Sequence, residues 1–274
     1  MQGQEPVLLV GFGNMGQALA RGWLAAGRAP ATIRVIDNAP AALAAAESLG
    51  LAAGKALDDP AAAFRPAVVV LAVKPNQLSA VLDACRARGT GGTAYLSIAA
   101  GKTLEGLAAG LGAEAAIVRA MPNTPAAIGR GITALVANAR VTPAQRELCG
   151  ELLAAVGSVA WLDDESHMDA VTAVSGSGPA YVFLLVECLE RAALELGLAP
   201  ALAKQLALAT VAGAAAYAER ADVPAAELRK RVTSPNGTTQ AALDVLMAER
   251  GGLGELLRRA TEAAARRSRE LSSA

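Results

Sequence analysis

Three closely spaced glycines follow the first apolar run of the sequence and could bind a dinucleotide. Gly11, Gly13 and Gly16 have the G-x-G-x-x-G spacing, directly after "VLLV" and directly before a helical pattern. The first glycine permits a tight turn, the second lets the backbone approach a pyrophosphate, and the third lets the helix pack closely on the strand. Because strand, glycines, helix and second strand follow in order, we favour a dinucleotide site over a merely structural turn.

An acidic residue follows at the place where the ribose of such a dinucleotide is recognised. The second β-type run, "TIRVI", leads into Asp37, 21 residues after Gly16. A carboxylate here can hold the adenosine ribose hydroxyls, which favours NAD. Two alternatives stay open: Asp37 only begins the turn "DNAP", or Asn38 and the nearby backbone reorganise to accept a 2′-phosphate. The expected cofactor is therefore NADPH or NADH.

Two proline-containing corners follow later strands. They are "AVKPNQ" (residues 72–77) and "RAMPNTPAAIG" (119–129), and Pro75 and Pro122 stiffen them. Ligands of a doubly wound sheet bind outside the carboxyl ends of the strands, so both corners are expected to face the crevice of the glycine loop. The alternative is that the prolines only stop the strands.

A turn before a late helical run could bind an anion. In "TSPNGTTQAAL" (233–243), Thr238 or Thr239 can cap free N–H groups, and Gly237 permits a positive φ. A helix N-terminus attracts anions, although an ordinary capped helix would have the same pattern.

Acid catalysis by histidine has one candidate, His167, because the sequence holds no other histidine. It lies where the last strand gives way to a long helix, so a surface or capping histidine is the plainer interpretation. A reduced carbonyl would need such an acid, whereas a protonated cyclic imine accepts hydride without forming an oxyanion. The sequence therefore favours a substrate that needs little acid catalysis.

The elements that position these residues change character once along the chain. From residue 7 to about 162, apolar runs alternate with alanine-rich helical runs: "VLLV", "TIRVI", "AVVVLAV", "TAYLSI", "AAIVRA", "GITALVA" and "SVAWL". This alternation predicts an α/β fold, an N-terminal Rossmann-type, parallel, doubly wound sheet, followed by an all-α C-terminal domain. We expect a dinucleotide-binding domain over residues 1–164 and a helical substrate-binding and dimerisation domain over residues 165–274. The apolar stretch 206–218 is interpreted as a buried helix too short to span a bilayer.

Composition excludes several classes of protein. The 274 residues carry 25 basic and 25 acidic side chains without a basic run interleaved with aromatics, which indicates a small-molecule substrate and no nucleic acid. The start lacks a secretory pattern, and no membrane partner is expected. The three cysteines are far apart and form no C-x-x-C pair, which fits the cytoplasm and no metal. With 53% hydrophobic but 3% aromatic residues, the core is expected to be Ala, Leu and Val, with a large subunit contact.

The long C-terminal motifs make the chain recognisable. "DAVTAVSGSGPAYVF" (169–183) and "LRKRVTSPNGTTQAAL" (228–243), with "GFGNMG", "AVKP" and "MPNTP", resemble the pyrroline-5-carboxylate reductase family over nearly the whole chain. The resemblance implies NAD(P)H-dependent reduction of L-1-pyrroline-5-carboxylate to L-proline, the last step of proline biosynthesis. It also implies a homodimer that assembles into a larger homo-oligomer.

The resemblance assigns roles to residues of this chain. It implies Thr239 and Ser177 as catalytic residues, with Thr239 touching the ring nitrogen and residues 175–178 lying beside the nicotinamide. It implies a carboxylate site at Ser234, Gly237, Thr238 and Thr239. It implies cofactor contacts by Gly11, Gly13, Asn14, Met15, Gly16, Asp37, Ala72, Val73, Lys74, Pro75 and Asn123. Asn236 departs from the family, where glycine is common, but Asn tolerates a positive φ.

Three other classes of protein explain less of the sequence than the pyrroline-5-carboxylate reductase family does. The 3-hydroxyacid dehydrogenases resemble the pattern but place a lysine one turn beyond the glycines, whereas "PAYVFLLVE" has none before Lys204. A non-catalytic dinucleotide sensor leaves "TSPNGTTQ" without a purpose. A purely structural oligomer leaves the glycine loop unexplained as well.

Overall fold

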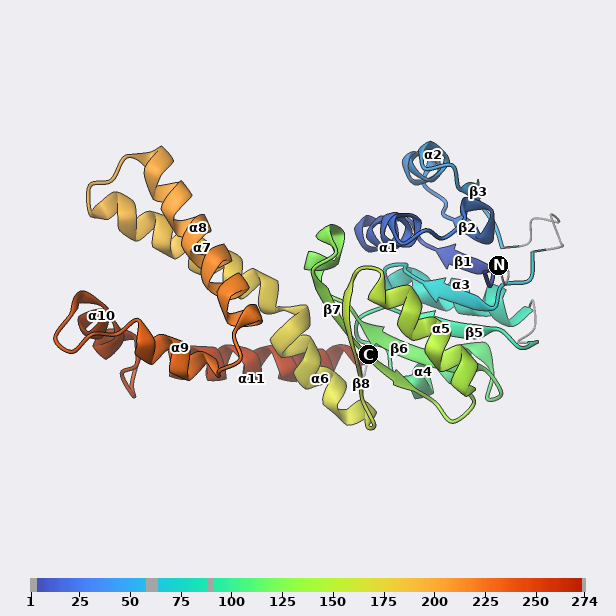
Figure 1. The fold of residues 1–274 in the computed structure, drawn as a ribbon. Coiled ribbons are helices and arrows are strands. Elements are labelled where there is room, and N and C mark those ends of the chain that lie inside the picture. Colours follow the sequence, from blue (N-terminus) through green and yellow to red (C-terminus); the bar gives the residue numbers. More distant parts are fainter. Residues whose placement is uncertain (1–3, 58–63, 88–90, 273–274) are drawn as a thin grey trace. The chain divides into compact units, whose positions relative to one another are not determined.

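The computed structural model describes residues 4–57, 64–87 and 91–272, and its contacts divide the chain into two compact units (Figure 1). The first unit comprises residues 1–176 and 265–274, and the second comprises residues 177–264. The boundary expected after residue 164 stays a prediction.

The first unit is built on one sheet, which has eight strands in the described residues. They are β1 (Val7–Val10), β2 (Ile33–Ile36), β3 (Ala52–Gly54), β4 (Val68–Leu71), β5 (Ala94–Ser97), β6 (Ala116–Met121), β7 (Gly131–Ala137) and β8 (Gly157–Trp161). Their order is β3-β2-β1-β4-β5-β6-β7-β8. Every neighbouring pair is parallel except β6 and β7, which are antiparallel. The chain reverses its direction of winding between β1 and β4, which is where a doubly wound sheet opens a ligand crevice.

Helices cover both faces of this sheet. They are α1 (Asn14–Ala25), α2 (Pro40–Ser48), α3 (Leu78–Ala87), α4 (Leu104–Leu111) and α5 (Pro143–Ala154). Val7 and Leu9 pack in one core with α1, α2 and α5, whereas Leu8 and Val10 pack in a second core with α3 and α4. Side chains alternate between the faces of a strand, so a strand covered on both sides must be apolar throughout, as "VLLV" is. The indole Nε1 of Trp23 donates to Leu152 O (2.7 Å) and ties α1 to α5.

Short elements connect the sheet to the second unit. The 3₁₀ turns are η1 (Pro30–Thr32), η2 (Pro75–Gln77), η3 (Thr124–Ile128) and η4 (Glu165–His167). After β8 the chain passes through η4, the short helix α6 (Met168–Val171) and a π-helical turn, η5 (Thr172–Gly176). Single π-turns inside helices often mark functional positions.

The second unit is helical throughout its described residues, as the sequence predicts. Its helices are α7 (Gly178–Glu195), α8 (Pro200–Arg220), α9 (Ala225–Arg231), α10 (Thr238–Leu246) and most of α11 (Leu253–Ser272). α7 and α8 pack along one another, and Figure 1 shows them side by side.

The interpretation of residues 206–218 as a short buried helix is wrong for the single chain. The helix containing them, α8, has 21 residues, of which only Ala203 and Ala207 are buried. By length and apolar composition alone, residues 165–195 and 200–220 could each span a membrane, a criterion that core helices of soluble proteins also meet. Most residues of α8 are therefore not buried within the single chain.

Candidate active site

The glycine loop has the geometry that a pyrophosphate requires. Gly11 has φ 96°, and a Cβ there would lie 2.6 Å from Ala72 O, so a side chain is excluded by both conformation and space. A Cβ on Gly16 would collide with Gly11 O. Gly13 differs, because a Cβ there would meet nothing within 4 Å. The open side of Gly13 and the N-terminus of α1, which has no side-chain cap, leave room for a phosphate.

The loop, Asp37 and the first proline corner meet in one cleft. Gly11, Asp37 and Ala72 directly follow β1, β2 and β4, so they lie at the carboxyl edge of the sheet, at its switch point. The cleft has a volume of about 640 Å³. Of the predicted cofactor residues, Gly11, Gly13, Asp37, Ala72, Val73 and Lys74 line it.

The remaining predicted cofactor residues lie elsewhere in the first unit. Asn14 and Met15 line a smaller hollow of about 350 Å³, together with Arg21 and Thr124. Gly16 and Pro75 line neither space, within the described part of the chain. Gly16 serves helix packing, and Pro75 opens the turn η2.

The second proline corner holds the π-turn. The amide of Asn123 donates from Nδ2 to Ser175 Oγ (3.3 Å) and accepts at Oδ1 from Ile132 N (3.0 Å). A Cβ on Gly176 would contact Met121 Cε closely, so the last residue of η5 lies against the side chain at the end of β6. Both ends of the Asn123 amide are therefore used by the protein itself.

The proposed carboxylate cradle is an uncapped helix N-terminus in the second unit. Gly237 N donates to Ser234 O (3.0 Å), which closes a turn with Pro235 second and Asn236, at φ 59°, third. This arrangement is that of a type II turn. α10 begins at Thr238, and its N-cap Gly237 provides no side-chain bond.

Two details of that turn differ from the sequence interpretation. Neither threonine caps the helix, because both lie inside it. The positive φ belongs to Asn236, whereas Gly237 has φ −85° and is needed because a Cβ would lie 2.5 Å from Ser234 Oγ. Asn236 therefore supplies the positive φ that the turn requires, which agrees with the tolerance of asparagine for this conformation.

The other candidate catalytic residues, Ser177 and His167, do not lie together in one site. Ser177 is the residue before α7 and makes no side-chain cap bond. His167 is exposed in η4, outside the cleft, which agrees with a surface histidine.

Beside His167, Ser166 donates to the Asp164 carboxylate from its hydroxyl (2.6 Å) and its N–H (2.8 Å), which lowers the pKa of Asp164. In the described residues no cluster of three or more His, Cys, Asp or Glu could hold a metal ion.

Gln77, in the proline corner expected to face the crevice, also lines the cleft, whereas sequence reasoning missed Lys55. Lys55 follows β3, whose three residues "AAG" carry no strand signal. Had β3 been recognised as the neighbour of β2, the residue after it would have been expected beside Asp37.

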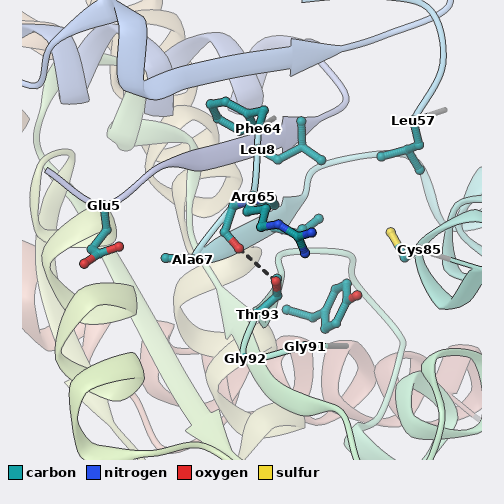
Figure 2. A pocket seen from close by; sticks show the side chains of 13 residues that line it. Glu5, Leu8, Leu57, Phe64, Arg65, Ala67, Cys85, Gly91, Gly92 and Thr93 are labelled. Carbon is teal, nitrogen blue, oxygen red and sulfur yellow. Dashed lines mark hydrogen bonds between the residues drawn. The ribbon is translucent and has the colours of Figure 1, made fainter. Parts of the chain in front are cut away.

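A second cavity lies at the opposite edge of the sheet (Figure 2). It has a volume of about 330 Å³ and is lined by Glu5, Arg65 and Thr93 with apolar neighbours. Thr93 Oγ1 donates to Pro66 O (2.8 Å) beside it. These three residues precede β1, β4 and β5, at the amino edge of the sheet, whereas a doubly wound sheet binds ligands at the carboxyl edge. Leu57 lines both this cavity and the cleft.

Fold and site together define a dinucleotide-dependent oxidoreductase with an α/β nucleotide domain and a helical domain. Residues 6–120 match the family "NADP oxidoreductase coenzyme F420-dependent", and residues 165–271 match "Pyrroline-5-carboxylate reductase dimerisation". The pyrroline-5-carboxylate reductase of Pseudomonas aeruginosa is 45% identical, over 97% of this chain and 96% of that protein. The chain belongs to the pyrroline-5-carboxylate reductase family, as its motifs predict.

Solved structures agree with this assignment. A pyrroline-5-carboxylate reductase from Coxiella burnetii superposes with a TM-score of 0.90 at 38% identity, covering 98% of both chains. The pyrroline carboxylate reductase of Plasmodium falciparum, solved with NADP bound, gives 0.86 at 27% identity and covers 99% of this chain and all of that one. The present chain is accordingly an oxidoreductase of proline biosynthesis with an NAD(P)-binding domain and a dimerisation domain.

Proposed function

We propose that this chain holds NAD(P)H in the cleft lined by Gly11, Gly13 and Lys74 and pyrroline-5-carboxylate at the N-terminus of α10. Bound NAD(P)H supplies the hydride that reduces the imine carbon to give L-proline. The observation that carries the proposal is the uncapped start of α10 behind a rigid turn. Its free N–H groups provide donors for a carboxylate without an arginine.

The chemistry needs orientation more than acid catalysis. A protonated imine is already electrophilic, and hydride addition makes a neutral amine, so no oxyanion has to be stabilised. The Thr239 hydroxyl is proposed to hydrogen-bond the ring nitrogen, and Ser177 to lie beside the ring. Ser234, Gly237 and Thr238 complete the carboxylate cradle. The site's main contribution is then to hold the imine carbon in one geometry for attack.

The cofactor side of the proposal covers two groups of residues. Gly11, Gly13, Asp37, Ala72, Val73 and Lys74 would contact the cofactor directly, since they line the cleft. Asn14 and Met15 would contact it from the smaller hollow beside α1. For Gly16, Pro75 and Asn123 the geometry favours a supporting role, because their contacts are with the protein.

Assembly and compartment extend the same proposal. The family match of residues 165–271 to a dimerisation domain, and exposed apolar side chains on α7 and α8, support a homodimer that assembles further. The biosynthetic role of the family supports a cytoplasmic location. The proposed domain boundary stays at residues 164 and 165, at the start of the dimerisation match.

The deciding experiment follows the absorbance of NADH and of NADPH with and without pyrroline-5-carboxylate at neutral pH. Oxidation that depends on the imine is expected. Gly13→Val is the matched control, because its side chain would fill the open approach to the loop and prevent cofactor binding. If the wild-type chain binds both cofactors without oxidising either, it is a sensor or acts on another substrate.

A further inference from the structure

The Asp37 carboxylate is held rigidly between the glycine loop and the turn after β2. Its Oδ2 accepts from Phe12 N at 2.7 Å, and its Oδ1 accepts from Ala39 N at 2.8 Å. Its own N–H donates to Gly54 O (3.1 Å), which also fixes the backbone. A carboxylate with both oxygens engaged cannot rotate out of the cleft without breaking these bonds.

The turn after Asp37 offers little to a phosphate. The N–H of Ala39 is already donated to Asp37, and Pro40 has none. The N–H groups of Ala42 and Leu43 both donate to Ala39 O. Asn38 lines the cleft and can donate to a phosphate, but an adenosine 2′-phosphate would also meet a fixed negative charge there. Ribose hydroxyls would instead meet an acceptor with lone pairs to spare.

Lys55 could attract a 2′-phosphate to this cleft, which Lys74 also lines. Lys55 follows Gly54, whose carbonyl accepts the N–H of Asp37, and lines the same cleft. Its side chain is exposed. A flexible, hydrated ammonium is a weaker determinant than a carboxylate anchored by two backbone donors, because ordering the lysine costs conformational entropy.

We infer that Asp37 makes this cleft select NADH over NADPH, and that the same carboxylate holds the glycine loop in place. The inference rests on the proposed function, since it concerns the cofactor of that reaction. The two roles have different signatures: loss of the charge changes the ratio of the two cofactors, whereas loss of the anchor weakens both.

The test measures kcat/KM for NADH and NADPH in the wild-type chain, Asp37→Asn, Asp37→Ser and Lys55→Met. The wild-type chain is expected to favour NADH by about tenfold or more, since like charges brought together are strongly disfavoured. Asp37→Asn keeps the shape and removes the charge, so its ratio should move toward NADPH by about the same factor. Its amide nitrogen cannot accept from one of the two N–H groups that hold the carboxylate, so a partial loss for both cofactors is also expected. Asp37→Ser should do likewise, with an added loss for both cofactors because Phe12 N loses its acceptor.

Several results would overturn the inference. A wild-type chain that uses NADPH as well as NADH contradicts the selection, and so does an unchanged ratio in Asp37→Asn. A ratio that moves more in Lys55→Met than in Asp37→Asn assigns the selection to the lysine instead. Direct titration of each variant with NADH and NADPH, without imine, repeats the comparison independently of turnover. It therefore separates failure of this inference from failure of the proposed reaction, and thermal melts identify any variant that does not fold.

Discussion

Thr239 is the second residue of α10, and its hydroxyl makes no hydrogen bond within the described residues. The fold does not use this group, so its removal should change catalysis and leave stability intact. We predict that Thr239→Ala lowers kcat/KM for the imine. The expected loss of transition-state stabilisation is roughly 1–3 kcal/mol, the cost of one lost buried hydrogen bond. NADH binding should be unchanged, and Thr32→Ala, on the exposed turn η1, is the control. Full activity of Thr239→Ala would refute its assigned role.

Cys149, in contrast to Thr239, is buried in the fold and has no expected role in catalysis, so its removal should change stability. Burial in α5 raises the pKa of its thiol from 9.0 to about 12. Between these values the unfolded chain has lost the proton and the folded chain has kept it, so stability falls as the pH rises. The thiol should contribute a slope of up to about 1.4 kcal/mol per pH unit above pH 9. Urea unfolding from pH 8 to 11 should show a shallower slope for Cys149→Ala, whereas Cys188→Ala, which removes an exposed thiol, should retain the wild-type slope.

Among the elements, η4 is fastened to the sheet by one carboxylate. Glu165 Oε1 accepts from Arg119 Nη1 of β6 (2.7 Å) and from Leu104 N at the start of α4 (2.8 Å). The Arg119 side chain is only 6% exposed, so removing its partner leaves a buried, unpaired charge. We predict that Glu165→Ala lowers the free energy of unfolding by roughly 3–5 kcal/mol. The matched control is Glu114→Ala, which breaks an exposed ion pair with Arg140 and should cost less than about 1 kcal/mol. Equal losses in urea titrations would contradict the clamp.

The turn before α10 tests how an element positions the substrate. Asn236 has φ 59°, a conformation that glycine adopts freely and alanine only with strain. Asn236→Gly should keep the KM for the imine, whereas Asn236→Ala should raise it, because about 1–2 kcal/mol of strain disfavours the turn. If both variants keep the wild-type KM, the turn does not position the carboxylate.

At the scale of the whole molecule, the sequence predicted the strands with strong local signals. The seven apolar runs all lie on strands, whereas β3 was missed because "AAG" lacks β-branched and aromatic residues. The strand β7 was predicted, but its antiparallel direction was not, since alternation of residues does not encode strand direction. The connection from Met121 to Gly131 is shorter than the dozen or so residues that a parallel crossover needs, and could have indicated it.

The site was predictable where its chemistry is local. The glycine loop and Asp37 follow a fixed spacing in one βαβ unit, so their positions at one cleft could be inferred. Lys55 could not, because its place depends on the pairing of β2 with β3. The positive φ was assigned to Gly237 and not to Asn236, because either residue type can adopt it and the turn type was unknown. The burial of α8 was mispredicted because an apolar run does not encode whether the same chain covers it.

The dimerisation domain carries large apolar side chains that are exposed in the single chain. Phe183 is 65% exposed on α7 and Leu208 is 56% exposed on α8, although both belong to a domain whose family forms dimers. Large apolar patches seldom stay in contact with water, so we expect a second copy to cover them. The melting temperature should then rise with protein concentration, because association stabilises the folded chain by mass action.

Phe183→Glu places a charge on that surface and should shift the sedimenting species toward monomer and abolish the concentration dependence of melting. Ala44→Glu, an equally large change at an exposed position of α2 in the first unit, should leave both properties unchanged. A monomeric wild-type chain would contradict the dimer. Recovery of the wild-type chain only with detergent would instead mean that a membrane covers these helices, since their length and composition permit it. The two explanations differ in what removes the apolar surface from water, and sedimentation without detergent separates them.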